Sequence, residues 1–385
     1  MRIPFDHEKI NTLMENDGVD LLLASTKDNI RYLTGGFVFF FFAHKDAIGV
    51  SRYLPILGYP KGDPSKAFYI GNALEGWQHE VEPFWVPNVR NDQWHSGTTG
   101  KEAANAIREL GLEKGTIAIE KGFLPADAYD ALREELPDAK FTDALFILEN
   151  LRSVKRADEL ALLKEASNHI IGSMVTVMNS TLAGTTTYEI AERVRKEETQ
   201  RGLDFEYCLT CTGPSFNRAP SDATWKKGNI LSLDSGGNLH GYLGDLCRMA
   251  VMGEPTSLMK DLLGEVQAIQ AAARAAIRPG ITGNEIHEKA FAEKAKCTHN
   301  NEIKFVAHGM GMIQHEAPRL SSDGSVPYPG SHANRPIEAG MVLSVETDLK
   351  NEEVGFVKLE DTVVVTESGF EAYGDDARDW VQVEG

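Results

Sequence analysis

The sequence predicts two domains: an α/β domain over residues 1–150, and a second domain over residues 151–385 that is built from two similar halves. Strand-like and helix-like segments alternate through the first domain, as they do in α/β folds. A charged segment that becomes a long amphipathic helix, residues 151–178, marks the boundary, which we place near residues 150–156. Beyond this helix one short pattern of residues occurs twice, and the repetition predicts the two halves.

Alternating segments define the first domain. Apolar spacing predicts helices over residues 7–18, 100–115 and 125–140, and strands over residues 19–25, 67–71 and 116–120. The run Phe37–Ala43, FVFFFFA, is far shorter than the roughly 20 residues that span a bilayer. It predicts a buried strand or an apolar contact surface at a subunit interface. The domain contains no phosphate-binding loop and no nucleophile elbow, so we expect it to shape or assemble the protein.

The repeated pattern lies in residues 183–194, AGTTTYEIAERV, and residues 279–290, PGITGNEIHEKA. In each copy we expect a helix to end at a Gly turn and the next helix to begin with a T-x-x-E capping box. At one constant offset, Gly184 matches Gly280, Thr186 matches Thr282, Glu189 matches Glu285 and Ile190 matches Ile286. A domain made of two similar halves usually places its site between them.

Composition limits the classes of partner. The net charge of -18 repels phosphate backbones and anionic membrane surfaces, so we expect neither nucleic acid nor a membrane as partner. The N-terminus lacks the apolar core of a signal peptide. Cys208 and Cys211 form a single CxxC, which favours plain packing over a zinc site in the absence of a second pair. Few cysteines and an acidic surface indicate a reducing cytoplasm.

Residues 230–251 predict a hairpin with one aspartate on each arm. The apolar runs Ile230–Leu233 and Leu246–Val251 flank a glycine-rich middle, as in paired buried strands. A buried carboxylate is costly unless positive charge neutralises it. Asp234 and Asp245 therefore indicate a cation between the strands. The alternative is a surface hairpin whose aspartates lie at exposed ends.

Three later segments carry further polar residues in apolar or glycine-rich surroundings. His308 lies within FVAHGMGMIQHEAP, Glu346 ends the predicted strand MVLSV, and Glu360 lies in the predicted strand VKLEDTVVV. With the two aspartates, these residues form a ligand set that suits Mn, Co or Zn. Four carboxylates carry too much charge for one buried ion, so we expect two ions about 3.5–4 Å apart.

A water shared by two such ions becomes hydroxide near neutral pH and can attack a carbonyl group. His315 is not needed as a ligand, and it could donate to the developing oxyanion or carry a proton. Each residue also has a simpler interpretation. A single carboxylate can be a salt-bridge partner, His308 a turn histidine bonded to backbone, and His315 a surface residue paired with Glu316.

Four motifs make the second domain resemble the pita-bread metallopeptidase family, which includes prolidase, aminopeptidase P, methionine aminopeptidase and creatinase. The motifs are DxGxxxxGYxxDxxR at Asp234–Arg248, HGxGxxxHExP at His308–Pro318, ExGMVxxxE at Glu338–Glu346 and EDxVxVTExG at Glu360–Gly369. Residues 28–36, DNIRYLTGG, resemble the creatinase-type N-terminal domain. The resemblance implies an α+β pita-bread fold for residues 151–385. It also implies that the five candidates bind a pair of divalent metal ions.

The sequence departs from the prolidase-like pattern around the ligands. Lys304 stands where these members usually carry a histidine, four residues before His308. The loop of residues 212–225 contains no histidine, although a histidine usually lies ahead of the first aspartate. Lys358 replaces the usual arginine, and Glu346-Thr347-Asp348 replaces Glu-Pro-Gly. The metal ligands are thus kept, while residues that contact the substrate have changed.

The resemblance implies a metal-dependent hydrolase that cleaves Xaa-Pro peptides. We expect His315 and Glu346 to be catalytic, and Lys304, Arg218, Lys358 and Tyr242 to contact substrate. An alternative keeps the fold but acts on a small nitrogen- or sulfur-containing metabolite by C–N hydrolysis or elimination, which the changed residues favour. A catalytically silent binding protein and a metal-free creatinase-like enzyme are disfavoured, because all five ligand positions survive. Family members with this N-terminal domain usually form homodimers, and Phe37–Phe42 is a candidate contact.

Overall fold

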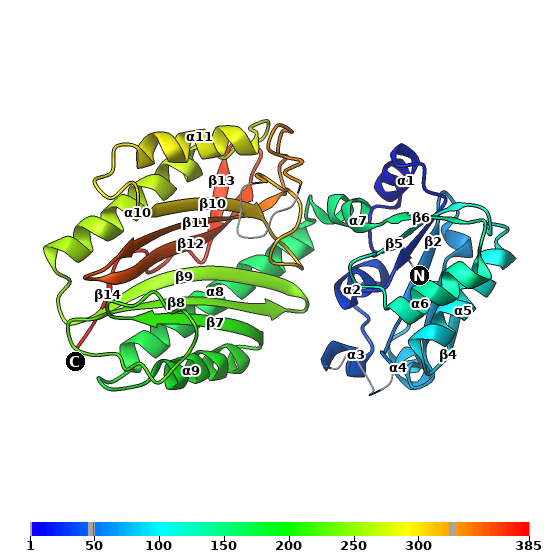
Figure 1. The fold of residues 1–385 in the computed structure, drawn as a ribbon, viewed down its shortest axis with the longest axis horizontal. Helices are drawn as coiled ribbons and strands as arrows, with labels where there is room; N and C mark the ends of the chain where they lie inside the picture. Colours follow the sequence, from blue (N-terminus) through cyan, green and yellow to red (C-terminus); the bar gives the residue numbers. More distant parts are fainter. Residues whose placement is uncertain (1, 45–48, 50, 323–328, 385) are drawn as a thin grey trace. The chain divides into compact units, whose positions relative to one another are not determined.

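The computed structural model describes residues 2–44, 49, 51–322 and 329–384. The chain divides into two compact units, Met1–Leu151 and Arg152–Gly385, which Figure 1 shows in blue to teal and in green to red. Among the described residues, no helix combines the length and the apolar character that crossing a bilayer requires.

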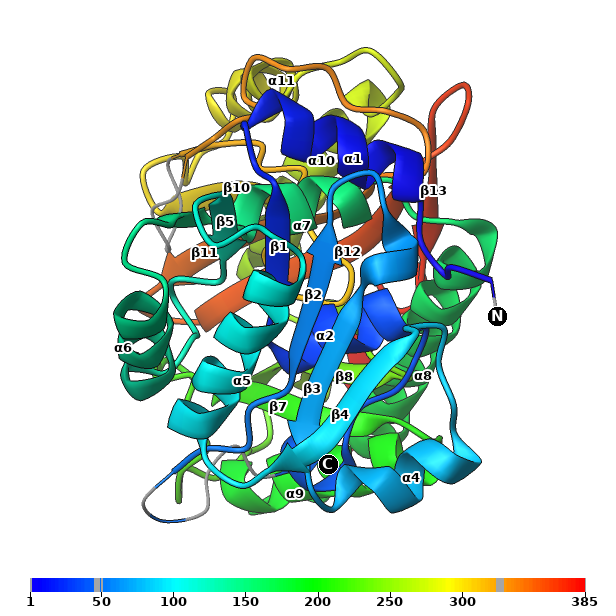
Figure 2. The same cartoon turned by 90° about the vertical axis from the view of Figure 1, so that its right-hand side faces the viewer.

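The first unit contains a six-stranded mixed sheet in the order β4-β3-β2-β1-β5-β6. Its strands are β1 (Leu21–Ala24), β2 (Ile56–Pro60), β3 (Phe68–Asn72), β4 (Asn88–Gln93), β5 (Thr116–Ile119) and β6 (Lys140–Asp143). Its helices are α1 (His7–Asn16), α2 (Lys27–Thr34), α3 (Phe40–His44), α4 (Glu75–Val81), α5 (Ser96–Glu109), α6 (Ala126–Glu135) and α7 (Leu145–Arg152). Figure 2 shows α5 and α6 on one face of this sheet, where Ala103 and Ile107 of α5 pack against strand residues such as Leu23 and Ile70.

The aromatic run Phe37–Ala43 does not form the predicted strand. Helix α2 ends at Gly35, whose φ of 89° turns the chain, and α3 begins only five residues later. Phe39 is buried and packs edge-on against Tyr53, with ring centroids 5.7 Å apart, while Phe40 is 52% exposed. The rings of this run pack against other aromatic rings, and its backbone does not pair with a neighbouring strand. The prediction of a strand was therefore wrong.

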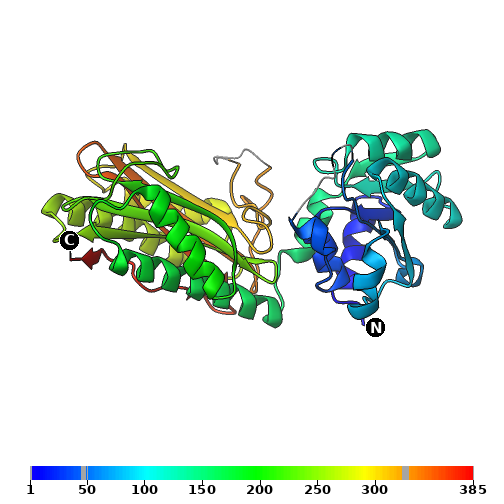
Figure 3. The same ribbon diagram turned by 90° about the horizontal axis from the view of Figure 1, so that it is seen from below.

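The second unit contains an antiparallel sheet in the order β10-β11-β12-β9-β8-β7, to which β13 and β14 add at the side. The strands are β7 (Asp204–Thr212), β8 (Ile230–Leu239), β9 (Tyr242–Met252), β10 (Ile303–Gly309), β11 (Val342–Asn351), β12 (Gly355–Val365), β13 (Phe370–Tyr373) and β14 (Val381–Val383). The helices are α8 (Ala157–Ser180), α9 (Thr187–Gln200), α10 (Ser257–Ala276) and α11 (Gly283–Lys294). Two helices followed by three strands occur twice in this order, as the predicted repeat requires. Figure 3 shows α8 and α9 packed along their half of the sheet.

Both predicted capping boxes are present. Thr186 accepts a hydrogen bond from the Glu189 backbone at 3.2 Å, and the Glu189 carboxylate accepts from the Thr186 backbone at 2.8 Å. In the second half, Thr282 and Glu285 exchange the same bonds at 3.3 and 2.9 Å. A capping box satisfies N–H groups that a helix start would otherwise leave without a partner. The repeated sequence therefore forms the same capped helix start in each half.

Helices cover one face of the second sheet, and the side chains that contact them define that face. Ser235 of β8 donates to Glu198 of α9, and Asp361 of β12 pairs with Arg274 of α10. Phe305 of β10 packs edge-on against His287 of α11. Because successive side chains of a strand point to opposite faces, the residues next to these three point away from the helices. The predicted ligands occupy that opposite face.

Candidate metal centre

Five strands carry the five predicted ligands. Asp234 lies on β8, Asp245 on β9, His308 on β10, Glu346 on β11 and Glu360 on β12. Two of these residues lie at positions that differ from those the sequence predicted. Glu346 lies inside β11 and not at its end, because the strand continues as far as Asn351. His308 lies in β10 and not in a turn, although its Nδ1 atom is 3.2 Å from the Gly309 carbonyl oxygen.

Strand register brings these residues together in two adjacent rows. In the first row, Glu360 lies opposite Glu346 on one side and opposite Cys247 on the other, and Cys247 lies opposite Asp234. In the second row, His308 lies opposite Ser344, and Asp245 lies two residues along β9 from Cys247 of the first row. Residues 74 positions apart, such as Asp234 and His308, therefore reach one site because the sheet places β12 and β9 side by side.

Three of the predicted ligands form a compact buried group. Asp245, His308 and Glu360 each offer one ligand atom, and these atoms all lie within 4.8 Å of one another. The His308 Nε2 atom is 3.8 Å from Oε1 of Glu360 and 3.9 Å from Oε1 of Glu346. Ser344 donates to the same Glu360 oxygen at 2.7 Å, which fixes the orientation of that carboxylate.

Lys358 places its ammonium group among the carboxylates. Its Nζ atom lies 2.7 Å from Oδ2 of Asp234, 2.7 Å from Oε2 of Glu346 and 2.7 Å from Oε2 of Glu360. Lys358 is buried, and it shares the ligand face of β12 because it precedes Glu360 by two residues. A residue predicted to contact substrate thus contacts three predicted metal ligands.

Arg218 also pairs with Asp234. Its guanidinium contacts Oδ2 of Asp234 and lies over the ring of Phe356, with 4.8 Å from the guanidinium carbon to the ring centroid. Arg218 comes from the histidine-free loop between β7 and β8. Asp234 therefore has two cationic partners. A carboxylate with two such partners is already neutralised, whereas the hairpin alone suggested that a cation between Asp234 and Asp245 would neutralise it.

Asp245 has neutral partners that sequence analysis missed. The Tyr207 hydroxyl donates to Oδ1 of Asp245, and the Gln314 amide donates to Oδ2 at 2.9 Å and to the Tyr207 hydroxyl at 2.8 Å. Gly236 permits this arrangement, because a Cβ atom there would overlap the Tyr207 ring. Gly236, two residues after Asp234, was the signal in the sequence that a bulky side chain lies against β8 at this position.

His315 stands next to the group without being one of its three members. It is half-buried and follows the loop after β10, and its ring stacks on that of His308. Burial and the nearby charge of His308 lower the pKa of His315 to about 4. A neutral imidazole keeps one N–H donor at physiological pH, which suits hydrogen bonding to a developing oxyanion.

Charge interactions divide the cluster into two parts. Burial raises the pKa of Asp245 well above its usual range, and the Glu360 carboxylate raises it further. Burial also acts to raise the pKa of Glu360, but Lys358 and His308 outweigh it and lower that pKa. Against the effect of burial, Glu360 and the nearby carboxylates raise the pKa of His308 to about 9. Lys358 and Arg218 thus place their positive charges on the Asp234 side of the cluster, while Asp245 shares the other side with His308.

Three further residues that the sequence placed at the site make contacts outside the metal cluster. The Tyr242 hydroxyl donates to Glu159 of α8 at 2.9 Å. Lys304 is exposed on β10, where it lies opposite Asp348 of β11. Glu316 does not pair with His315: it is buried and forms ion pairs with Arg152 at 2.8 Å and Lys155 at 3.1 Å.

The residues present fit a divalent cation. Two carboxylates and an imidazole that are buried together on adjacent strands form a donor set typical of Mn, Co or Zn. The orienting bonds from Ser344, Tyr207 and Gln314 are of the kind that hold metal ligands in place. The Asp234 and Glu346 side of the cluster is different, because Lys358 supplies positive charge there.

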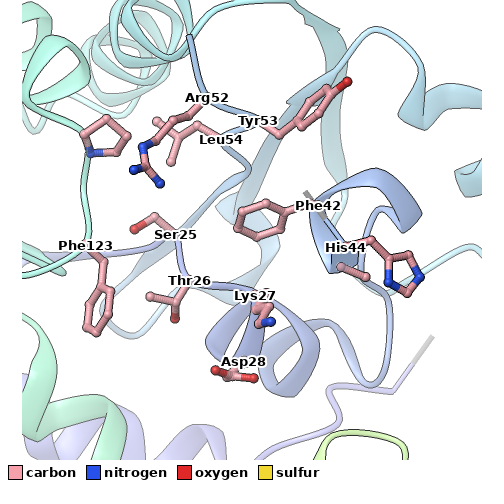
Figure 4. A pocket seen from close by; sticks show the side chains of 12 residues that line it. Ser25, Thr26, Lys27, Asp28, Phe42, His44, Arg52, Tyr53, Leu54 and Phe123 are labelled. Carbon is pink, nitrogen blue, oxygen red and sulfur yellow. The ribbon is translucent and has the colours of Figure 1, made fainter. Parts of the chain in front are cut away.

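The first unit also contains a pocket of about 320 Å³. Figure 4 shows its lining, in which Phe42 and Phe123 lie on either side of Ser25 and Thr26, and Arg52 points in from above. Its lining residues all come from residues 25–125, whereas the four motifs lie in the second unit. The chemistry that the motifs indicate therefore belongs to the cluster on the second sheet.

Both the sequence and the fold are similar to those of known peptidases. The family model described as metallopeptidase family M24 matches residues 161–367, and the one described as the creatinase/prolidase N-terminal domain matches residues 7–154. The uncharacterized peptidase YqhT of Bacillus subtilis is 25% identical over 368 residues, which cover 94% of this chain and 95% of that protein. The Xaa-Pro dipeptidase of Lactobacillus delbrueckii subsp. lactis is 24% identical over 380 residues, with 95% of both proteins covered.

The solved structure of a dipeptidase from Pyrococcus horikoshii OT3 has the same fold. It matches with a TM-score of 0.81 and 24% identity, and the match covers 98% of this chain and 99% of that one. Together with the two family matches, it confirms the predicted fold: a creatinase-type N-terminal domain followed by a pita-bread domain with an internal repeat.

Proposed function

Because the chain belongs to metallopeptidase family M24, we propose that it is a metal-dependent peptidase that cleaves small peptides with proline after the scissile bond. The observation that carries the proposal is the buried group of Asp245, His308 and Glu360, which lies on the motifs that the family shares. The Xaa-Pro dipeptidase from Lactobacillus delbrueckii subsp. lactis, which this chain matches over nearly its full length, supports the choice of substrate.

The side chains of the cluster have distinct proposed roles. Asp245, His308 and Glu360 bind the metal, and Tyr207 and Gln314 hold the Asp245 carboxylate in one orientation. A divalent ion at this position would polarise the scissile carbonyl and lower the pKa of a water molecule. His315 donates a hydrogen bond to the carbonyl oxygen as negative charge develops there.

Several finer predictions from the sequence stay predictions. They are the second metal ion, the shared hydroxide, the catalytic role of Glu346 and the identity of the metal as Mn, Co or Zn. The contacts of Lys358 bear on two of these, the second metal ion and the hydroxide that two ions would share. The non-peptide alternative is not favoured, because the relatives reported above are named as peptidases.

A panel of Xaa-Pro dipeptides tests the proposal. The purified protein is treated with a chelator, loaded separately with Mn, Co or Zn, and assayed for release of free proline. We expect cleavage with at least one metal, its loss in chelator, and its recovery when metal returns. Asp245→Ala, prepared in the same way, controls for contaminating peptidases and should be inactive. If no Xaa-Pro peptide is cleaved under any metal condition, the proposed substrate class is wrong.

Cellular location and assembly are part of the same proposal. All four cysteines, Cys208, Cys211, Cys247 and Cys297, are free thiols in the structure, which supports a reducing cytoplasm.

The homodimer rests on the family resemblance alone. Light scattering coupled to size-exclusion chromatography tests it, and a mass near 42.4 kDa, that of one chain, would contradict it.

A further inference from the structure

We propose that Lys358 takes the place of a second metal ion, so that this chain holds one divalent ion, bound by Asp245, His308 and Glu360. The inference deepens the proposed function and rests on it, because it concerns the same centre. It differs from the two-ion arrangement that the resemblance implies. The difference follows from where the Lys358 ammonium group lies.

Lys358 fills the space that an ion bound by the same oxygens would need. The Lys358 Nζ atom lies 2.7 Å from one oxygen of each of Asp234, Glu346 and Glu360. These oxygens come from β8, β11 and β12, so the ammonium group lies at the point where they converge. A metal ion bound by the same oxygens would need to approach each to about 2.0–2.2 Å. The ammonium group and such an ion cannot occupy this position together.

The charges of the cluster balance with one divalent ion. Asp234, Asp245, Glu346 and Glu360 carry four negative charges when ionised. Lys358 and Arg218, which both pair with Asp234, offset two of them. Because an imidazole that binds metal is neutral, His308 adds no charge, and the remaining two charges match one divalent ion. A second ion would leave excess positive charge in a buried site, and such uncompensated charge is strongly unfavourable.

The two carboxylate oxygens of Glu360 face different sides of the site. Its Oε2 atom faces Lys358 at 2.7 Å, and its Oε1 atom faces His308 at 3.8 Å and accepts from Ser344. One oxygen is thus used by the ammonium group, and the other points towards the side of the cluster where His308 and Asp245 lie. Asp245 itself is bonded to the neutral side chains of Tyr207 and Gln314, so its charge is left for the ion.

The chemistry of lysine explains why this residue suits the role. An ammonium group has three N–H donors around one compact charge, which can serve three oxygens that converge from different strands. A guanidinium presents its donors in a planar fork that is suited to one carboxylate at a time. Lys358, which stands where the family resemblance predicts arginine, is therefore able to act as the central cation of this half-site.

Metal content tests the inference directly. Wild type, Lys358→Met and the control Lys350→Met are loaded with excess Mn, passed through a desalting column and measured by elemental analysis. Lys350 is an exposed lysine on the neighbouring strand β11. We expect about one ion per chain in wild type and in the control, and about two in Lys358→Met, because the position between the oxygens of Asp234, Glu346 and Glu360 is then no longer filled by an ammonium group. Calorimetric titration with Mn supplies an independent stoichiometry.

Two results would overturn the inference: two ions per chain in wild type, or one ion per chain in a folded Lys358→Met variant. If Lys358→Met does not fold, Glu346→Gln decides. In the one-ion arrangement this variant keeps about one Mn per chain with an affinity within about tenfold of wild type. Loss of the bound ion in Glu346→Gln would show that Glu346 is a required ligand and would overturn the assignment.

The outcome is separable from that of the proposed function. Two ions per chain together with cleavage of Xaa-Pro peptides would overturn the inference and leave the peptidase proposal intact. One ion per chain without cleavage of any Xaa-Pro peptide would support the inference and overturn the proposed substrate. Neither measurement depends on the other.

Discussion

The imidazole rings of His308 and His315 are stacked, with centroids 3.8 Å apart and planes inclined by 14°. The chain between them folds back because Gly309 and Glu316 form an isolated bridge. Gly311 makes room for this turn, since a Cβ atom there would collide with the Glu316 carboxylate. Glu316 is itself anchored by buried ion pairs, so the loop holds His315 rigidly against a ligand of the proposed metal.

His315→Phe should keep the stacked ring but remove both nitrogen atoms. We expect the variant to bind metal as wild type does and to lose at least about 100-fold in kcat, because one hydrogen-bond donor to an oxyanion contributes about 10²–10³-fold. Metal content and steady-state kinetics with an Xaa-Pro dipeptide measure the two effects separately. If the ion is lost together with the activity, His315 supports the metal and is not a separate catalytic group.

Tyr207→Phe should weaken metal binding without changing the number of sites. The hydroxyl orients the Asp245 carboxylate, and loss of such an orienting bond typically costs about 10–100-fold in metal affinity. Competition with a metal-binding dye measures the change. Tyr188→Phe, on the surface of α9 and 57% exposed, is the matched control and should bind metal as wild type does. Equal affinity in both variants would rule out the orienting role of Tyr207.

Glu198→Gln should stabilise the protein at alkaline pH. Burial raises the pKa of Glu198 to about 8, and its Oε2 atom has no hydrogen-bond partner within the described part of the chain. A carboxyl group whose pKa rises on folding stabilises the fold when protonated, and this contribution is lost as the pH rises from about 4.5 to about 8. Above pH 8 the variant should exceed wild type by up to about 4 kcal/mol in free energy of unfolding.

Urea unfolding at pH 5.5, 7 and 8.5 checks this expectation, since the difference between variant and wild type should grow with pH. Glu197→Gln, one residue earlier and partly exposed, is the control and should show no such trend. A constant difference across this range would mean that the Glu198 carboxyl group does not titrate there.

Thr186→Ala and Thr282→Ala should destabilise the two halves to a similar extent. Each threonine caps the helix that follows the Gly turn, and loss of such a cap costs about 1 kcal/mol. Thr199→Ala, on the exposed side of α9, removes no cap and should leave the stability unchanged or slightly higher, because alanine favours helix. Chemical denaturation measures all three. A large effect at only one of the two caps would show that the halves differ in how their helices are anchored.

Short stretches of sequence determined much of this protein. Apolar spacing predicted the strands β1, β3 and β5 and the helices α1, α5 and α6 of the first unit, and the capping pairs Thr186–Glu189 and Thr282–Glu285 predicted the repeat. These signals are local, since periodicity and capping depend on residues a few positions apart. The motifs identified the family and a metal-dependent hydrolase, both of which the family match confirms. The aromatic run Phe37–Ala43 shows the limit of local signals, because apolar character alone did not distinguish strand from helix.

Only the tertiary structure decided which side chains meet at the cluster. Tyr207 and Gln314 reach Asp245 from distant parts of the chain, and no spacing in the sequence predicts those contacts. Lys358 was expected beside substrate, yet the register of β12 turns it towards the carboxylates of three strands. A shift of one residue would turn it towards the helices instead, because strand side chains alternate between faces. The sequence names five candidate ligands, and the order and register of the strands decide that a lysine shares their site.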